Sequence, residues 1–190
     1  DVALVNNIAA AHLERMGSLL GVAQTKGAIY AALGAGGTAV VNADDAFGEW
    51  FQQEVIRARD SGRRVLRFGL DASAEVGARD IRPDARGSRF VLLTPQGEVE
   101  VQLALPGRHN VRNALAAAAI GLACGVALED IAAGLADARP VTGRQVAHAL
   151  AAGIELVDDS YNANPGSLEA AIQALAATGD EAWLVLGDMR

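Results

Sequence analysis

The stretch LPGRHNVRNALAAAAIGLACG, residues 105–125, joins a polar loop to a helix that suits only a protein interior. From Ala114 to Ala123 it contains no charged residue, and its alanine, leucine and isoleucine side chains predict a helix that packs closely on several sides. Pro106 and Gly107 predict a turn directly before it. We therefore expect the rest of the fold to be arranged around this helix.

Two amides stand at the polar entrance of this helix. Asn110 and Asn113 are three positions apart, so a helix places them on one face. An amide both donates and accepts hydrogen bonds, and the pair could read a purine edge or fix a ribose. The alternative is one helix cap and one exposed polar residue, since asparagine is a common cap. Spacing alone leaves both interpretations open.

Strands and helices alternate along the first part of the chain. Apolar runs predict strands at VALVNNI (2–8), Thr38–Ala43 and Arg63–Gly69, and helices at Leu19–Leu33, capped by Ser18, and at Asp45–Arg59. Short glycine-containing links between them are typical of a parallel sheet with crossover helices. The fold class is therefore expected to be α/β with a mostly parallel sheet.

The pattern changes after this alternation. Residues 74–105 form short alternating runs with a turn at 95–97, which predicts a small antiparallel β insertion. A helix at Leu128–Ala138 follows, and Pro140 and Gly143 mark a boundary. Beyond Arg144, a strand IELVDDS (154–160), a helix from Pro165 and a strand EAWLVLGD (181–188) predict the start of a second, Rossmann-like α/β domain.

Composition restricts the classes of function. The net charge of -7 argues against a nucleic-acid-binding surface. Apolar runs are too short to span a membrane, and the first residues do not resemble a signal peptide. Cys124 is the only cysteine and lies in the apolar helix, so we expect a buried free thiol and a reducing, cytoplasmic location.

Lysine is used once in this chain. Lys26 is the only lysine among the 16 basic residues. A primary amine can lose its proton and be modified, whereas a guanidinium stays protonated. A single lysine can also arise by chance, so its role depends on other residues.

A second polar segment, DDSYNANP at residues 158–165, precedes the last predicted helix. Ligands of open parallel sheets gather beyond the carboxyl ends of the strands, where this segment is expected to lie. Asp, Ser and Asn are also ordinary cap and turn residues. Binding and turn formation therefore stay equally open.

Six segments together resemble the Mur ligase family. In chain order they are NNIAAAHLE (6–14), KGAI (26–29), LPGRHNVRNALAAA (105–118), PVTGR (140–144), DDSYNANPGS (158–167) and VLGDM (185–189). The DDSYNANP form resembles the branch that adds D-alanyl-D-alanine. The resemblance implies that residues 1–143 are the latter part of a central ATP-binding domain and that residues 144–190 begin a C-terminal ligase domain.

The resemblance also implies roles for single residues. Lys26, carbamylated by carbon dioxide, and His12 would act as catalytic residues that hold a magnesium ion. The residues that would contact ATP are Asn110, Asn113, Arg144 and Asp159. Asn162 and Asn164 would lie in a loop that faces the substrates. Tyr161 stands where other members carry a phosphate-contacting lysine, so no such role is carried over to it.

The implied reaction belongs to peptidoglycan synthesis. ATP would phosphorylate the terminal carboxylate of a UDP-N-acetylmuramoyl tripeptide, and the amine of D-alanyl-D-alanine would then displace phosphate, with magnesium offsetting charge. No G-x-x-x-x-G-K-[ST] phosphate loop occurs, so we expect the 190 residues alone to be inactive. Two alternatives stay open: another Mur or folylpolyglutamate-type ligase, and a non-catalytic nucleotide-binding module. His109 and His148 join no metal set by spacing.

Overall fold

Two units make up the chain, residues 1–138 and residues 139–190. The structure is a computed structural model, and it describes residues 1–9, 16–56, 62–84, 87–144, 146–163, 165–176 and 181–187. The division between Ala138 and Arg139 comes shortly before the junction expected after Gly143.

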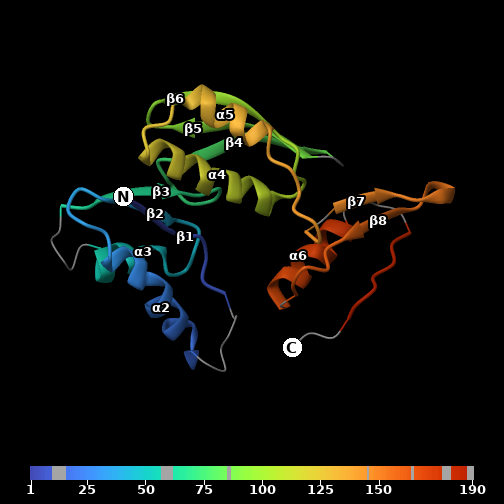
Figure 1. The fold of residues 1–190 in the computed structure, drawn as a ribbon, viewed down its shortest axis with the longest axis horizontal. Coiled ribbons are helices and arrows are strands. Elements are labelled where there is room, and N and C mark those ends of the chain that lie inside the picture. The colour runs from blue at the N-terminus through green and yellow to red at the C-terminus, as the bar shows by residue number, and fades with distance from the viewer. Residues whose placement is uncertain are drawn as a thin grey trace. The chain divides into compact units, whose positions relative to one another are not determined.

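A parallel three-stranded sheet lies at the centre of the first unit (Figure 1). Its order is β1-β2-β3, formed by β1 (Val2–Val5), β2 (Thr38–Asn42) and β3 (Arg64–Phe68). Helix α2 (Leu19–Ala31) begins at the expected cap, where Ser18 Oγ accepts the N–H of Gly21 at 3.1 Å. The predicted strands, the first helix and the parallel pairing are confirmed.

The helix expected over Asp45–Arg59 is confirmed over residues 48–56, but it begins three residues later than expected. Helical structure is limited to the short α3 (Gly48–Trp50) and the π-helical η1 (Phe51–Ile56), and residues 57–61 lie outside the described ranges. The carboxylate of Asp45 accepts the N–H of Phe47 at 2.8 Å and that of Ile8 at 2.7 Å. Because this side chain bonds a turn and a second loop, it competes with helix formation at its position.

The second sheet of this unit is antiparallel, as expected for residues 74–105. Its order is β4-β5-β6, formed by β4 (Gly77–Asp84), β5 (Gly87–Thr94) and β6 (Gly97–Leu103). In this sheet β4 lies at an edge, and it contains Pro83 and a register shift between Arg79 and Arg82. Both features suit an edge strand, because they interrupt the row of unpaired main-chain N–H and C=O groups to which another strand could bind.

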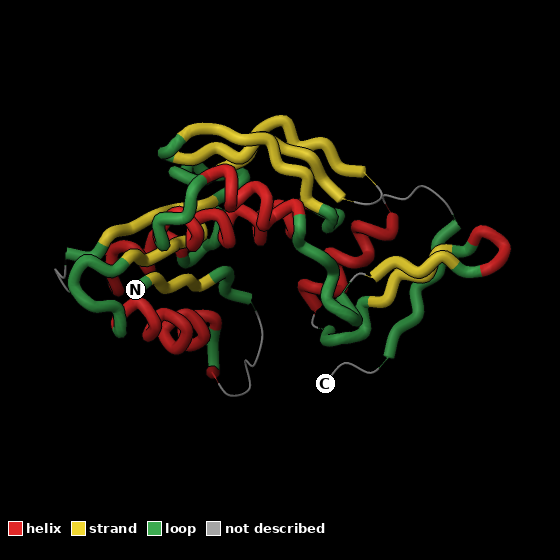
Figure 2. Tube along the Cα trace, turned by 45° about the horizontal axis from the view of Figure 1, so that its top comes forward, coloured by secondary structure: helices red, strands yellow, loops and turns green. Residues whose placement is uncertain are grey.

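Helix α4 (Arg108–Ala123) lies between the two sheets (Figures 1 and 2). Ala114, Ala118 and Ala119 are at most 4% exposed, so the backbone of α4 approaches its neighbours closely. The same core includes side chains from both sheets and from α5 (Leu128–Ala136), among them Val40, Phe68, Phe90, Leu92 and Ile131. The prediction of a helix buried on several sides is confirmed.

A second core covers the opposite face of the parallel sheet. Along β2, Val40 faces α4, whereas Ala39 and Val41 face α2 and η1, which is the alternation that a strand covered on both faces requires. Gly27 of α2 lies against Phe51, and a Cβ there would come within 2.7 Å of the ring. Glycine at this position therefore lets α2 pack closely on η1.

Tyr30 joins the backbones of β1 and β2. Its fully buried hydroxyl accepts the N–H of Val5 at 2.9 Å and donates to the carbonyl of Val40 at 2.6 Å. Burial raises the pKa of Tyr30 to about 12, so the hydroxyl stays protonated and keeps its donor. This contact fixes β1 at the residue before the polar loop that follows it.

Asp44 joins the loops after β2 and β3. Its side chain is 7% exposed, pairs with Arg112 at 3.3 Å, and accepts three main-chain N–H groups, those of Leu70, Asp71 and Ala72. Burial acts to raise the pKa of Asp44, but these hydrogen bonds and the Arg112 charge outweigh it and hold the pKa below its ordinary value. The carboxylate is therefore ionised at neutral pH and stabilises both loops.

Cys124 is exposed, so the expectation of a buried thiol is wrong. It is the residue that ends α4, where the chain turns towards α5 and leaves the core. Among the described residues, no helix combines the length and the apolar composition needed to cross a membrane.

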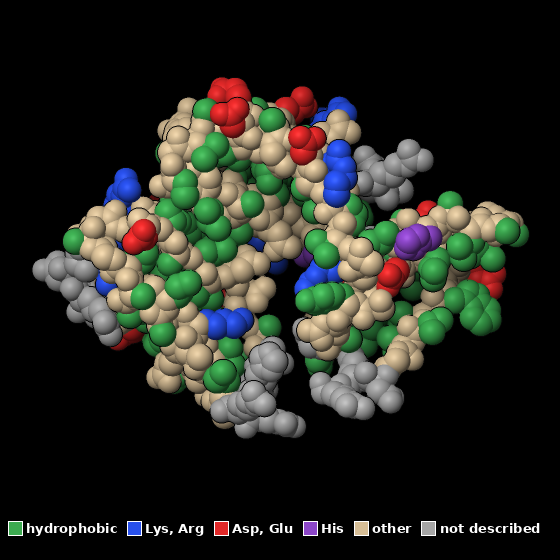
Figure 3. Space-filling view, viewed as in Figure 1, with side chains coloured by type: hydrophobic (Ala, Val, Ile, Leu, Met, Phe, Trp, Pro, Cys, Tyr) green, Lys and Arg blue, Asp and Glu red, His purple; other side chains and the backbone are tan. Residues whose placement is uncertain are grey.

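The second unit pairs β7 (Val146–Ala149) with β8 (Glu155–Asp158) in an antiparallel hairpin that contains the 3-10 turn η3 (Ala151–Gly153). Helix α6 (Pro165–Ala176) begins at the expected proline. The strand expected at residues 181–188 is wrong over its described part, since residues 181–187 pair with no described strand, and Trp183 and Val185 are 82% and 91% exposed. A strand needs a neighbour for its ladder hydrogen bonds. Hydrophobic side chains are visible on the surface of this unit (Figure 3).

We predict that Tyr30→Phe lowers the free energy of unfolding by about 1–3 kcal/mol, because the N–H of Val5 and the carbonyl of Val40 both lose a buried partner. Urea denaturation followed by Trp50 fluorescence measures the change, since Trp50 packs on Phe51 in the same core. Tyr161→Phe is the matched control, because Tyr161 is 65% exposed. Equal stability of the two variants would contradict the role of the Tyr30 hydroxyl.

We also predict that Asp44 makes stability depend on acid. Because its folded pKa is depressed, its contribution is fully present above the ordinary pKa of an aspartate and is lost as the pH falls below that value and through the depressed folded pKa. Asp44→Asn should cost about 1–3 kcal/mol at neutral pH and flatten this acid dependence. Urea denaturation at several pH values provides the measurement, with the exposed Glu54→Gln as control. An unchanged slope in Asp44→Asn would refute the assignment.

Candidate active site

Polar residues gather beyond the carboxyl ends of the parallel strands. Asn6 and Asn7 follow β1, Asn42 ends β2, and Asp44 and Asp45 come next. In open parallel sheets this edge is where ligands bind. The edge therefore defines the candidate site of the first unit.

The loop after β1, Asn6–Ile8, is held at three successive main-chain groups by side chains from other elements. Asn42 Nδ2 donates to the carbonyl of Asn6 at 2.8 Å, and Lys26 Nζ donates to the carbonyl of Asn7 at 3.1 Å. Asp45 accepts the N–H of Ile8 at 2.7 Å. These bonds give a short irregular segment a defined course at the sheet edge.

Lys26 brings the only amine side chain of the protein to this loop. It lies on the exposed side of α2, one residue before the glycine that packs on Phe51. An exposed amine is accessible to a small electrophile such as carbon dioxide. His12, its expected partner, lies outside the described residues, and within the described ranges no three histidine, cysteine, aspartate or glutamate side chains form a metal-binding group.

The two amides of α4 have different environments. Asn110 Nδ2 donates to the carbonyl of Pro106 at 2.6 Å, a contact within the turn that precedes the helix. Asn113 is exposed, and its Oδ1 accepts a hydrogen bond from Asn6 Nδ2 at 3.0 Å. Asn110 thus makes a local contact, as expected if it serves as a helix cap, whereas Asn113 is hydrogen-bonded to the loop after β1.

The beginning of α4 is shaped by a glycine. Gly107, the cap residue, has φ +93°, and a Cβ there would come within 2.7 Å of the His109 imidazole. Glycine is therefore needed for this turn, which places the first residues of α4 at the sheet edge.

Charged pairs lie beside the amides. Arg112 pairs with Asp44 at 3.3 Å and lies 3.8 Å from the carboxylate of Asp71, and Arg108 also pairs with Asp71. Sequence reasoning singled out none of Asn6, Asn42 and Asp44 as functional residues. Their one signal was position, because each lies at or just beyond the end of a predicted strand.

In the second unit, the PVTGR and DDSYNANP segments meet. The N–H of Tyr161 donates to the carbonyl of Gly143 at 2.9 Å, and the Arg144 guanidinium carbon lies 4.2 Å from the centre of the Tyr161 ring. Gly143 has φ +74°, and a Cβ would lie 3.1 Å from the Tyr161 nitrogen. Tyr161 therefore orients Arg144 by cation–π stacking.

The remaining expected residues of this unit that the structure describes have exposed side chains. Hydrogen bonds from the hydroxyl and the N–H of Ser160 hold the pKa of Asp158 below its ordinary value. Asp159 and Asn162 are exposed, and Asn164 lies outside the described residues. Asp158 thus has the turn role that the sequence left open, while Asp159 and Asn162 face solvent.

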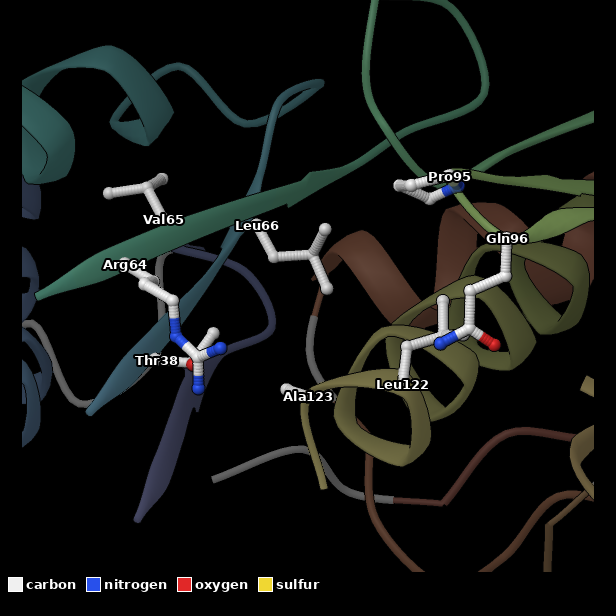
Figure 4. Close-up of a pocket in the computed structure, with 8 residues that line it drawn as sticks. All are labelled: Thr38, Arg64, Val65, Leu66, Pro95, Gln96, Leu122 and Ala123. Atoms are coloured by element: carbon white, nitrogen blue, oxygen red, sulfur yellow. The ribbon is translucent and has the colours of Figure 1, made fainter. Parts of the chain in front are cut away.

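A pocket elsewhere in the first unit contains none of these residues (Figure 4). It lies at the opposite, amino ends of β2 and β3, where Thr38 and Arg64 begin their strands, and the Arg64 side chain points towards Thr38. The end of α4 and the β5–β6 turn complete its lining. It is separate from the carboxyl-edge site.

Comparisons with known proteins agree with the resemblance of the six segments. Residues 1–121 match the family model described as the Mur ligase middle domain. The UDP-N-acetylmuramoyl-tripeptide--D-alanyl-D-alanine ligase of Escherichia coli (strain K12) is 48% identical over 191 residues, covering 100% of this chain and 41% of the relative. The chain thus spans about two fifths of the length of such relatives.

Solved structures give the same result. MurF from Acinetobacter baumannii has a TM-score of 0.85 at 38% identity, over 92% of this chain and 37% of that chain. The MurF ligase from Thermotoga maritima, solved in complex with ADP, shares the fold with a TM-score of 0.74 at 23% identity, over 92% of this chain and 39% of that chain. Taken with the family match over residues 1–121, these likenesses establish that the chain belongs to the Mur ligase family.

Proposed function

We propose that this chain is part of an ATP-dependent ligase that joins D-alanyl-D-alanine to a UDP-N-acetylmuramoyl tripeptide in the cytoplasm during peptidoglycan synthesis. One observation carries the proposal. The Lys26 amine and the Asn113 amide reach the same three-residue loop, Asn6–Ile8, at the carboxyl edge of the parallel sheet. The residues assigned to metal binding and to nucleotide binding are thereby linked through one segment that three side-chain hydrogen bonds hold in place.

The proposed acceptor and donor follow from the relatives. The Escherichia coli protein, 48% identical over the whole chain, is named for the tripeptide and for D-alanyl-D-alanine. Identity at this level over the whole aligned chain supports the same pair of substrates here. The nucleotide is supported by the ADP complex of the Thermotoga maritima ligase and by the amides on α4.

Each assigned residue has a proposed task. Asn110 and Asn113 contact the adenine of ATP from the first turns of α4. From the second unit, Arg144 and Asp159 contact ATP, and Asn162 and Asn164 contact the reacting substrates. The stacking of Arg144 on Tyr161 supports its part of this proposal, because an oriented guanidinium is suited to binding phosphate.

The proposed magnesium site consists of His12 and a carbamate on Lys26. A carbamate turns the amine into a carboxylate, the kind of hard oxygen ligand that magnesium prefers. The exposure of Lys26 and its reach to the sheet edge suit this modification. When bound, the ion offsets negative charge on the transferring phosphoryl group.

The experiment that tests the proposal is Lys26→Arg and Lys26→Ala in the intact ligase. Arginine keeps the positive charge and can still donate to the Asn7 carbonyl, but it forms no carbamate. We predict that both variants lose at least about 100-fold in activity, a loss typical of removing a group that stabilises transition-state charge. D-alanyl-D-alanine-dependent phosphate release measures it, and added bicarbonate should restore neither variant.

The exposed Gln24→Ala is the control, since Gln24 lies two positions away on α2. An active Lys26→Arg enzyme would rule out the carbamate. A panel of D-alanyl-D-alanine, glutamate and single amino acids as acceptors separates this ligase from related Mur and folylpolyglutamate-type ligases. A non-catalytic nucleotide-binding module would bind ATP equally well with Lys26→Ala and would ligate none of them.

The carbamate itself has a direct test. The native mass of the intact ligase should exceed its sequence mass by one carbon dioxide in bicarbonate buffer, and this increment should be lost in acid and in Lys26→Arg. Lys26 is the only lysine among the 190 residues, so Lys26→Arg leaves this chain without a lysine side chain. A mass increment that persists in Lys26→Arg would therefore place the carbamate in another part of the intact ligase.

A further inference from the structure

We propose that Asn6 is a positioning residue that sets which end of the Asn113 amide faces the nucleotide, and that it thereby gives the site a donor for N7 of the purine base. The inference rests on the proposed function and deepens it, because it gives a role to a residue outside the assigned contact set. The Asn6–Asn113 hydrogen bond of 3.0 Å, between residues 107 positions apart, is its starting point.

The backbone around Asn6 is fixed on both sides. The Tyr30 hydroxyl accepts the N–H of Val5, Asn42 Nδ2 donates to the carbonyl of Asn6, and Asp45 accepts the N–H of Ile8. A side chain that starts from such a backbone has few positions open to it. Asn6 can therefore act as a stationary donor towards α4.

The polarity of the Asn6–Asn113 contact is set by burial. Asn6 Oδ1 is buried and receives no hydrogen bond from the described part of the chain. If both amides were reversed, the NH2 group of Asn6 would occupy that position with its hydrogens unused, and an unpaired buried N–H is less tolerated than an underused carbonyl. Asn6 therefore donates, Asn113 Oδ1 accepts, and the NH2 of Asn113 is left for solvent or a ligand.

Asn110 has the opposite polarity. Its Nδ2 is engaged by the Pro106 carbonyl, which leaves its Oδ1 as the available group. Because Asn110 and Asn113 lie on one helix face, α4 offers an acceptor and a donor together. Adenine presents the matching pair, the N6 amine as donor for Asn110 and N7 as acceptor for Asn113. A 6-oxo purine keeps the N7 acceptor, so the Asn113 donor suits either purine and only the Asn110 acceptor distinguishes them.

The test compares nucleotides in the intact ligase. Asn6→Asp keeps the shape of the side chain but cannot donate at neutral pH, so Asn113 turns its NH2 inward and presents its oxygen to the nucleotide. We expect the KM for ATP to rise about tenfold with kcat nearly unchanged, as loss of one hydrogen-bond match implies. The KM for inosine triphosphate should rise by the same factor, because the N7 acceptor is common to both bases. A KM for ATP that stays within about twofold of wild type would contradict the positioning role. Gln102→Glu, an exposed amide-to-acid change on β6, is the matched control.

A double-mutant cycle separates positioning from general support and does not depend on the acidic variant. Asn6→Ala and Asn113→Ala should each raise the KM for ATP about tenfold, and the double variant should raise it no further, because Asn6 acts through Asn113. Effects that multiply, or a KM in Asn6→Ala within about twofold of wild type, would overturn the role of Asn6 while leaving the ligase function intact. A wild-type enzyme that shows no ATP-dependent ligation would overturn both proposals together.

Discussion

The close packing of α4 between two sheets is the constraint on which the rest of the first unit depends. Alanines at 114, 118 and 119 keep the helix thin, so that the parallel sheet and the antiparallel sheet share one core. A larger side chain at any of them would push the sheets apart, because protein interiors have few voids to absorb added volume. The same packing fixes where the helix begins, and hence where its amides lie.

The polar edge of the parallel sheet is built largely from side chain to main chain hydrogen bonds. Asn42, Asp44 and Asp45 each bind a neighbouring loop, and Lys26 reaches the loop after β1 from a separate helix. Such bonds turn three strand ends into one connected surface. This arrangement suits a site for a charged nucleotide, because fixed donors and acceptors need little rearrangement when charge develops in the transition state.

The second unit contributes a different kind of order. Its described strands form a small hairpin with largely exposed residues, yet two of the segments that resemble the Mur ligase family, PVTGR and DDSYNANP, meet through Gly143, Arg144 and Tyr161. Tyr161, to which the sequence assigned no role, thus supports the orientation of Arg144.

Local sequence determined the order of elements, the cap at Ser18, the parallel sheet, the β insertion and the buried helix, because periodicity, turn residues and helix caps act over a few residues. It also pointed to Lys26 and to the amides of α4. Tertiary structure alone decided that Asp45 bonds two loops and so delays the start of the following helix, that Cys124 is exposed and that residues 181–187 form no strand. It alone joined Asn6 to Asn113, because a hydrogen bond between segments 107 positions apart depends on how α4 packs against the sheet, and no local pattern records that packing.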